Sequence, residues 1–284
     1  MTQTLSCPAP AKLNLFLHVV GQRPDGYHLL QTLFRFIALD DTLHFTLRED
    51  GRIRRLNSVQ GVPEEQDLCV RAARLLQQQT GCTLGVDIRL EKRIPQGGGL
   101  GGGSSDAATT LIALNRLWSL QLSRASLMRT GLQLGADVPV FIFGENAFAE
   151  GVGEALQAYT LPTAWYLVLF PAVQVPTAKI FMHPELTRDS VCLTMRALKE
   201  LRQNDKLHND LQPVACRLYP EVARHISWLQ QRTKAMMTGS GACVYAEFAE
   251  RSQAEKILVE LPDDMTGIVT EGLLQHPLHA WLED

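Results

Sequence analysis

The sequence has few cysteines, and their spacing matches no metal-binding or redox motif. Its six cysteines are scattered over 284 residues, and no two stand at C-x-x-C spacing. Neither a zinc site nor a redox dithiol is therefore indicated, and we expect reduced, mostly buried thiols. The sequence also lacks an excess of charge of one sign. A formal net charge of -3 does not suit a protein whose whole surface neutralises a nucleic-acid backbone, so no nucleic-acid partner is expected.

Long hydrophobic runs are absent as well. No stretch approaches 18 uninterrupted apolar residues, so we predict no membrane span. The first twelve residues lack the basic region and apolar run of a secretory signal, and the expected location is cytoplasmic. Hydrophobic residues make up 45% and charged residues 20%, the balance of an ordinary globular protein. The oligomeric state stays open.

Hydrophobic periodicity predicts a mixture of strands and helices. Apolar residues alternate from Leu13 to Val19, which predicts a strand with one buried face. The opposite face would carry Lys12, Asn14, Phe16 and His18. Further strands are predicted over residues 42–47, 86–90, 165–170 and 242–248. Helices are predicted over residues 68–79, 107–118, 123–135, 195–202, 221–231 and 252–260.

These elements do not alternate strictly, so the predicted class is α+β rather than a doubly wound parallel sheet. A domain boundary is predicted near Gly151 to Gly153, which gives domains of residues 1–152 and 153–284. After the helix ending near Gly135, Pro139 should keep its preceding residue out of helical geometry.

Glycine is concentrated in one place. Six glycines fall within the seven residues from Gly97 to Gly103, between a predicted strand and a predicted helix. Such a loop exposes several backbone N–H donors, and the following helix adds the positive end of its dipole, which suits a polyphosphate. Ser104, Ser105 and Asp106 are all common N-cap residues. A flexible linker is the alternative, although linkers are not usually placed between a strand and an amphipathic helix.

Two familiar phosphate loops do not match this segment. A Walker A loop needs a lysine where Gly103 stands. A dinucleotide-binding loop needs an acidic residue about 20 positions later, and residues 107–136 contain neither Asp nor Glu.

A third family does match. The segment from Pro95 to Ala108, PQGGGLGGGSSDAA, resembles the second motif of the GHMP kinases, the superfamily of galactokinase, homoserine kinase and mevalonate kinase. Further motifs of that superfamily follow the same order along the chain: PAKLNLFL from Pro10, RPDGYH from Arg23, LGADVPVF from Leu134 and TGSGAC from Thr238. Together they are most similar to the branch that phosphorylates a cytidine-diphosphate-linked alcohol in the non-mevalonate route to isoprenoid precursors. The resemblance runs from Pro8 to about Cys243.

The resemblance implies a two-domain GHMP kinase fold with the active site in the cleft between the domains. ATP, with Mg²⁺, would be the co-substrate, and no protein side chain is assigned to the metal. The implied ATP-binding residues are Asp67, Lys92, Pro95, Gln96, Gly97, Gly98, Gly99, Leu100, Gly101, Gly102, Gly103, Ser104 and Ser105. Gly239 to Gly241 resembles the third motif of the family, which packs against the glycine-rich loop, although a simple hairpin turn fits these residues as well.

Two residues are implied in catalysis. On the residues alone, Asp137 fits a turn aspartate and Lys12 a solvated lysine at the start of a strand. The resemblance implies that Asp137 is the catalytic aspartate and that Lys12 is its partner. A lysine near an aspartate keeps it ionised and can orient the attacking hydroxyl.

Five residues are implied at the substrate. The resemblance places Asn14 near the substrate, Tyr27 and Phe181 on the two faces of its cytosine, His28 at the polar edge of the base and Thr177 in the same pocket. Stacking with edge hydrogen bonds is a general way to bind an unpaired base. Without the resemblance, Tyr27 and His28 fit surface residues and Phe181 fits a core position.

One position departs from the family pattern. Asp67 stands where relatives often carry an asparagine that serves the adenine. Ionised aspartate only accepts hydrogen bonds, so this side chain is a doubtful adenine reader, and Lys92 is a candidate neighbour of that base. Two other functions remain open, namely a GHMP kinase with a different alcohol substrate and an ATP-sensing module without catalysis.

Overall fold

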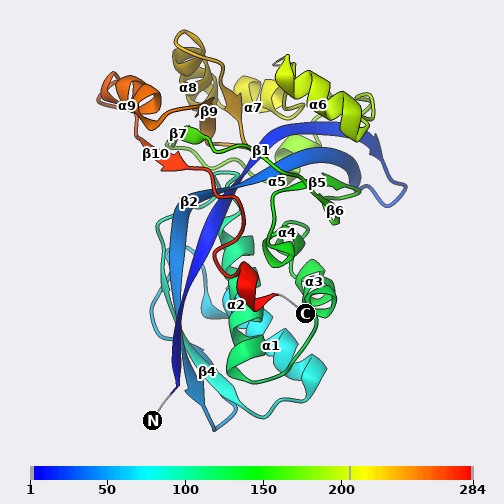
Figure 1. The fold of residues 1–284 in the computed structure, drawn as a ribbon, viewed down its shortest axis with the longest axis vertical. Coiled ribbons are helices and arrows are strands. Elements are labelled where there is room, and N and C mark those ends of the chain that lie inside the picture. The colour runs from blue at the N-terminus through cyan, green and yellow to red at the C-terminus, as the bar shows by residue number, and fades with distance from the viewer. Residues whose placement is uncertain (1–2, 205, 283–284) are drawn as a thin grey trace.

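The computed structural model describes residues 3–204 and 206–282. Its backbone is dominated by one long antiparallel hairpin, formed by β1 (Thr4–Gln22) and β2 (His28–Arg48). Figure 1 shows these two strands running from the lower end of the elongated molecule into its upper half. The hairpin therefore belongs to both halves of the fold.

The first sheet is mostly antiparallel and follows the hairpin, with helices on one face of its lower part (Figure 1). Strand order is β3-β4-β2-β5-β6, with β1 also paired to β2, and only β3 and β4 run parallel. The further strands are β3 (Ile53–Arg55), β4 (Gly85–Glu91), β5 (Ala147–Glu150) and β6 (Ala155–Ala158). The helices are η1 (Glu64–Gln66), α1 (Leu68–Thr80), α2 (Gly102–Leu117), α3 (Arg124–Leu132) and α4 (Val138–Phe143).

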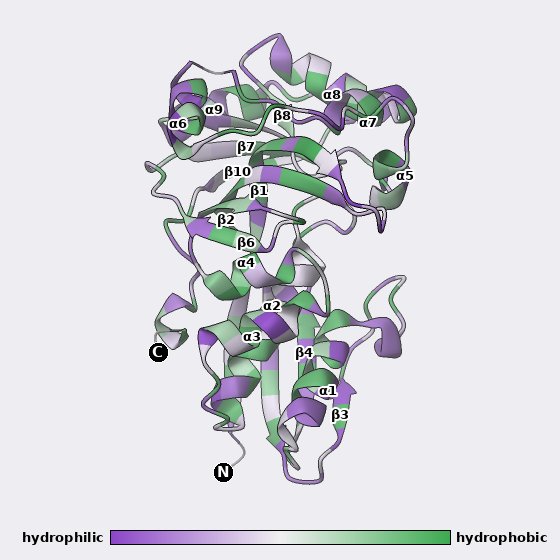
Figure 2. Cartoon of the chain, turned by 90° about the vertical axis from the view of Figure 1, so that its right-hand side faces the viewer, coloured by the Kyte–Doolittle hydropathy of each residue, from purple (hydrophilic) through white to green (hydrophobic). Residues whose placement is uncertain are grey.

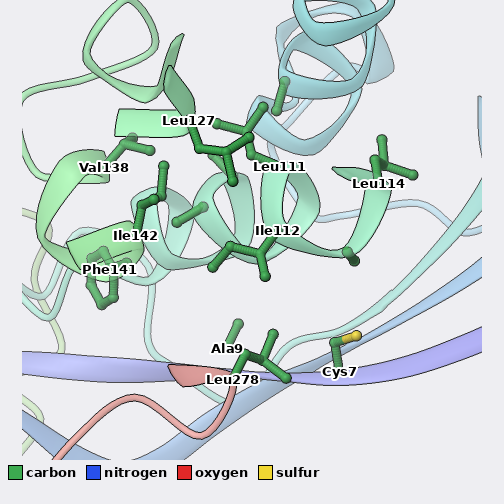
Figure 3. Close-up of a cluster of buried hydrophobic side chains, with 14 of the residues drawn as sticks. Cys7, Ala9, Leu111, Ile112, Leu114, Leu127, Val138, Phe141, Ile142 and Leu278 are labelled. Carbon is green, nitrogen blue, oxygen red and sulfur yellow. The ribbon is translucent and has the colours of Figure 1, made fainter. Parts of the chain in front are cut away.

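Helix α2 lies at the centre of the first hydrophobic core. Figure 3 shows Ile112 on the side of α2 that faces Ala9 of β1, and Leu111 on the side that faces Leu127 of α3. Leu278, from the far end of the chain, packs in the same cluster. Burial on both sides fixes α2, and hence the glycine-rich loop in front of it, relative to β1.

The upper half contains a second antiparallel sheet of order β10-β7-β9-β8. Its strands are β7 (Trp165–Leu169), β8 (Met236–Met237), β9 (Val244–Phe248) and β10 (Gly267–Glu271). Its helices are α5 (Thr177–Phe181), α6 (Met195–Gln203), α7 (Gln212–Leu218), α8 (Pro220–Gln230) and α9 (Arg251–Val259). Figure 2 shows polar residues on the outer sides of these helices, as expected for helices that cover a sheet. The chain ends in η2 (His279–Trp281), back against the first core.

Most predicted elements are present, but three local predictions are wrong. Strand β1 is buried on both faces over residues 9–19, and register shifts after Pro10, Asn14 and Val19 interrupt its alternation. Phe16 consequently packs in the same cluster as Leu13 rather than on the face of Lys12.

The other two corrections concern helix starts. Helix α2 begins at Gly102 with Gly101 as its N-cap, so Ser104, Ser105 and Asp106 lie inside the first turns. Val138, predicted to leave helical geometry, is the first residue of α4, with Pro139 at the second position. Proline is tolerated in the first turn because the N–H groups there have no helical partner.

The predicted domain boundary lies in the turn between β5 and β6, two strands that pair with each other. It stays a prediction. None of the helices in the described part of the chain is long and apolar enough to cross a membrane.

Candidate active site

A cleft of about 1270 Å³ opens between the two halves. Its lining comes from β1 and β2, the glycine-rich loop, the start of α2, the segment before α4, helix α5 and the turn at residues 239–241. Segments far apart in sequence therefore meet here, and the size suits a nucleotide together with a second ligand.

An ion pair lies on the cleft wall. The Nζ atom of Lys12 is 3.3 Å from Oδ2 of Asp137 and donates a hydrogen bond of 2.6 Å to Oδ1 of Asn14. The Lys12 side chain is 4% exposed and that of Asp137 is 38% exposed. The ammonium group is thus fixed by two oxygen atoms, whereas the carboxylate stays open to the cleft.

Asn14 is itself held in place. Its Nδ2 donates to the hydroxyl of Thr32 at 2.9 Å, and its backbone N–H donates to the hydroxyl of Thr238 at 2.9 Å. Thr32 and Thr238 lie in β2 and just after β8. Since Asn14 bonds to both, the amide that orients Lys12 is positioned by both halves of the molecule.

The glycine-rich loop has the backbone that the sequence predicts. Gly97, Gly99 and Gly101 all have positive φ, between 69° and 76°. The N–H of Lys12 donates to the carbonyl of Leu100 at 2.9 Å, so the loop is tied to β1. The loop then opens the 16-residue helix α2, whose first N–H groups lack helical partners and are available to an anion.

The second glycine turn packs against this loop, as the family resemblance implies. The N–H of Cys243 donates to the carbonyl of Gly98 at 3.1 Å. A Cβ added at Gly99 would lie 2.2 Å from the carbonyl oxygen of Thr238. Asn209 holds the second turn through hydrogen bonds of 2.8 Å to the carbonyls of Met237 and Gly239.

Aromatic residues gather at the other end of the cleft. The rings of His28 and Phe181 lie 5.0 Å apart at an interplanar angle of 35°. Tyr27, next to His28, is 64% exposed. The hydroxyl groups of Thr177 and Ser240 are 2.8 Å apart nearby. This end offers flat surfaces and a few hydrogen-bonding groups.

Comparisons with known proteins agree with this geometry. Residues 67–145 match the family model described as GHMP kinases N terminal domain, and residues 186–266 match GHMP kinases C terminal. A 4-diphosphocytidyl-2-C-methyl-D-erythritol kinase of Nitrosospira multiformis is 59% identical over 98% of this chain and 95% of its own. The enzyme of the same name from Thiobacillus denitrificans is 58% identical over 98% of each chain.

The chain belongs to the 4-diphosphocytidyl-2-C-methyl-D-erythritol kinases. A crystal structure titled 4-(cytidine 5'-diphospho)-2C-methyl-D-erythritol kinase superposes with a TM-score of 0.80 at 35% identity, covering 95% of this chain and all of the other. The predicted class is therefore confirmed, and the chain has the two-part α+β fold of GHMP kinases and is a small-molecule kinase.

The cleft brings together nearly all residues that the family resemblance implies. Of these, Ser105 does not reach the lining. It is fully buried, and its Oγ atom has no hydrogen-bond partner among the described residues. The reason is the early start of α2, which turns Ser105 into the core and leaves Ser104 facing the cleft.

Asp67 lies at the cleft, but its side chain serves the fold. One carboxylate oxygen accepts from the N–H of Cys69 at 2.8 Å and caps α1. The other accepts from Arg55 at 2.7 Å in a pair whose side chains are 7% and 5% exposed. With both oxygens engaged, Asp67 is a poor reader of adenine.

Lys92 is also paired. Its Nζ atom contacts carboxylate oxygens of Asp41 and Asp106, the latter at 2.8 Å. Burial lowers the pKa of Lys92, but the two carboxylates outweigh that effect and raise it. Burial raises the pKa of Asp106, with Asp41 adding to the shift and Lys92 opposing it. Lys92 thus offsets the negative charge beneath the start of α2, which keeps that end attractive to an anion.

Four residues at or behind the cleft were missed from sequence, namely Arg55, Asp106, Arg188 and Ser240. Arg55 pairs with Asp67. Asp106 and Ser240 belong to the glycine-rich motif and to the second glycine turn, but no site role was predicted for either side chain. Arg188 lines the cleft and donates from Nε to Nε2 of His28 at 3.1 Å. Nothing in the local sequence around Arg188 marks it, since its partner lies 160 residues earlier.

Two oxygen-bearing side chains of the cleft could share a Mg²⁺ ion with a bound phosphate. The described residues contain no group of three or more His, Cys, Asp and Glu side chains able to hold a metal. Mg²⁺ often binds through one or two protein oxygens and the phosphates of its nucleotide. The hydroxyl of Ser104 and the carboxylate of Asp137 line the cleft and supply oxygens of that type.

Proposed function

We propose that this chain transfers the γ-phosphoryl group of ATP to the 2-hydroxyl of 4-diphosphocytidyl-2-C-methyl-D-erythritol, a step of the non-mevalonate route to isoprenoid precursors. The observation that carries the proposal is the ion pair of Lys12 and Asp137 on the wall of a cleft that the glycine-rich loop and the aromatic side chains of Tyr27 and Phe181 also line. The names of the closely similar relatives specify the same substrate.

Phosphoryl transfer needs positioning and charge stabilisation more than covalent chemistry. The 2-hydroxyl oxygen attacks the γ-phosphorus in line, the bond from that phosphorus to the β,γ-bridging oxygen breaks, and ADP leaves. Asp137 accepts the hydroxyl proton. Lys12, fixed by Asn14, orients Asp137 and stabilises charge on the transferred group.

The glycine-rich loop from Pro95 to Gly103 holds the phosphates through its backbone N–H groups, together with the first turn of α2. Ser104 is the side chain best placed to share Mg²⁺ with the nucleotide. The ion would neutralise phosphate charge during transfer.

The substrate binds at the aromatic end of the cleft. Tyr27 and Phe181 contact the faces of the cytosine, His28 its polar edge, and Thr177 the same pocket. The cytoplasm is the proposed location, because all six cysteines are free.

The decisive experiment is a substrate comparison with purified protein. We expect ATP consumption with 4-diphosphocytidyl-2-C-methyl-D-erythritol at a kcat/KM far above that with mevalonate or homoserine. Equal or reversed values would indicate a GHMP kinase with another alcohol substrate. Binding of ATP without turnover of any of the three would instead favour a nucleotide sensor.

A further inference from the structure

The inference concerns Arg188, which lies behind His28 at the aromatic end of the cleft. Its Nε donates to Nε2 of His28 at 3.1 Å. Its other nitrogens donate to the carbonyls of Leu186, Phe181 and His183 at 2.9–3.0 Å. The guanidinium group is therefore anchored by backbone as well as by the imidazole.

This contact determines where His28 carries its proton. A guanidinium group has only donors and stays protonated in proteins, so Nε2 of His28 must be the acceptor. The ring is then neutral, with its single N–H at Nδ1. The nearby positive charge opposes protonation of the ring, and burial also lowers the pKa of His28. Within the described part of the chain, no hydrogen bond involves Nδ1.

A histidine held in this form discriminates between pyrimidines. Cytosine presents an acceptor at N3, and an Nδ1–H donor directed at that atom pairs with it. Both cytosine and uracil present an acceptor at O2, so the discrimination operates at N3. Uracil presents a donor at N3, which meets the same N–H unfavourably. A histidine free to move its proton to Nε2 could accept from uracil instead.

We propose that Arg188 is a specificity-determining residue, which locks His28 as an Nδ1–H donor and so selects a cytidine over a uridine substrate. The proposal rests on the proposed function, since it assigns His28 to the polar edge of the base. Arg188 is a positioning residue, because it acts through His28.

The main test compares two substrates in wild-type and Arg188→Met protein. The substrates are the cytidine-diphosphate-linked alcohol and its uridine-diphosphate-linked analogue. We expect the wild type to prefer the cytidine form by at least about tenfold in kcat/KM, the size of one unsatisfied hydrogen-bond donor. Arg188→Met should lower that ratio to about threefold or less, with the KM for ATP unchanged. Arg224→Met, which removes an exposed arginine of α8 that pairs with Asp264, is the control and should leave the ratio as in wild type.

Arg188 also donates hydrogen bonds to the backbone of residues 181–186. The test must therefore distinguish a purely structural role of Arg188 from its proposed effect on His28. Loss of these backbone hydrogen bonds would raise KM for both substrates by the same factor and leave their ratio unchanged, which would overturn the proposal. In a His28→Phe background, which keeps a ring but removes the N–H, Arg188→Met should have no further effect on the ratio. A further drop in the ratio in that background would also contradict the proposal.

Nitrogen-15 NMR of the ligand-free protein tests the tautomer directly. The His28 ring should carry its proton at Nδ1 in the wild type and shift toward Nε2–H in Arg188→Met. A wild-type proton at Nε2 would overturn the proposal. Because this measurement needs no substrate, it is independent of the proposed function, which fails separately if the wild type does not phosphorylate the cytidine-linked alcohol.

Discussion

Lys12 and Asp137 differ in exposure, and that difference agrees with the roles proposed for them. Lys12 lies almost fully buried, with its ammonium group against Asn14, Asp137 and the ring of Phe34, 5.3 Å from the ring centroid. Such an arrangement leaves Lys12 little freedom to move. Asp137 keeps one side toward the cleft, where an incoming hydroxyl can reach it.

Replacing Asp137 by asparagine tests its role. The variant keeps the shape of the side chain but cannot accept the hydroxyl proton as a carboxylate does. We expect kcat to fall about 100- to 10 000-fold, the usual contribution of a general base, with the dissociation constant of ATP nearly unchanged. Steady-state kinetics and calorimetric ATP binding measure the two quantities. Asp263→Asn, at an exposed position remote from the cleft, should behave as wild type. Retained turnover in Asp137→Asn would remove Asp137 from catalysis.

At the scale of single residues, the sequence predicts site residues that belong to a motif and misses those whose contacts are made only in the folded structure. Lys12 and Asp137 are separated by 125 residues and were paired only through the family resemblance. Arg188 and Arg55 lie in none of the quoted motifs, and their side-chain partners His28 and Asp67 lie 160 and 12 residues away in the sequence. Ser105 was expected at the cleft but lies in the core. The residue at which α2 begins decides which side chains face the cleft, and the sequence did not give that residue.

Strand β3 and helix α1 show how a departure from the family pattern is accommodated at the scale of elements. Asp67 caps α1 and also receives Arg55 from the end of β3. A second hydrogen bond from Arg55 reaches the carbonyl of Val62 at 2.9 Å. The carboxylate of Asp67 is thus neutralised and joins a strand to a helix.

Arg55→Met should therefore destabilise the fold. It would leave the buried carboxylate of Asp67 without its cation, a change that costs about 3–5 kcal/mol in comparable buried pairs. Arg54→Met is the matched control, because Arg54 is adjacent and half exposed, and its partner Asp87 keeps Arg48. We expect the control to unfold close to wild type in a urea titration. If the two variants unfold at the same urea concentration, the pair of Arg55 and Asp67 contributes no more than a surface pair.

The elements with strong periodicity were predictable. The predicted helix over 68–79 and strand over 165–170 differ from α1 and β7 by one residue at their ends. Strand β1 was predicted over residues 13–19, but its one-sided burial was wrong, since bulges shift the assignment of alternate residues to one face and both faces are buried. The start of α2 was missed because a glycine in left-handed conformation replaces the expected polar N-cap.

At the scale of the whole molecule, two glycine turns from different halves form the floor of the cleft. Each brings backbone against backbone, with Gly98 bonded to Cys243 and Gly99 in contact with Thr238. The long hairpin makes a further contact between the halves, since the backbone N–H of Asn14 in β1 donates to the hydroxyl of Thr238. The glycine-rich loop is therefore positioned by contacts with the second half as well as by its own helix.

Gly99→Ala tests whether this contact sets the geometry of the site. Gly99 has a φ of +76°, and an added Cβ would lie 2.2 Å from the carbonyl oxygen of Thr238, so the two turns must separate. Displacement of a positioning loop by about 1 Å can cost about 100-fold in rate, and we expect kcat/KM for ATP to fall by that order.

Gly81→Ala separates this effect from simple backbone strain. Gly81 ends α1 with a φ of +67° and has nothing within 4 Å of an added Cβ. Both variants should lose about 1 kcal/mol of stability from the left-handed conformation alone. Only Gly99→Ala should also lose activity, because only there does the new methyl group force the halves of the cleft apart. Equal kcat/KM in the two variants would mean that the glycine-rich loop holds ATP independently of the second half.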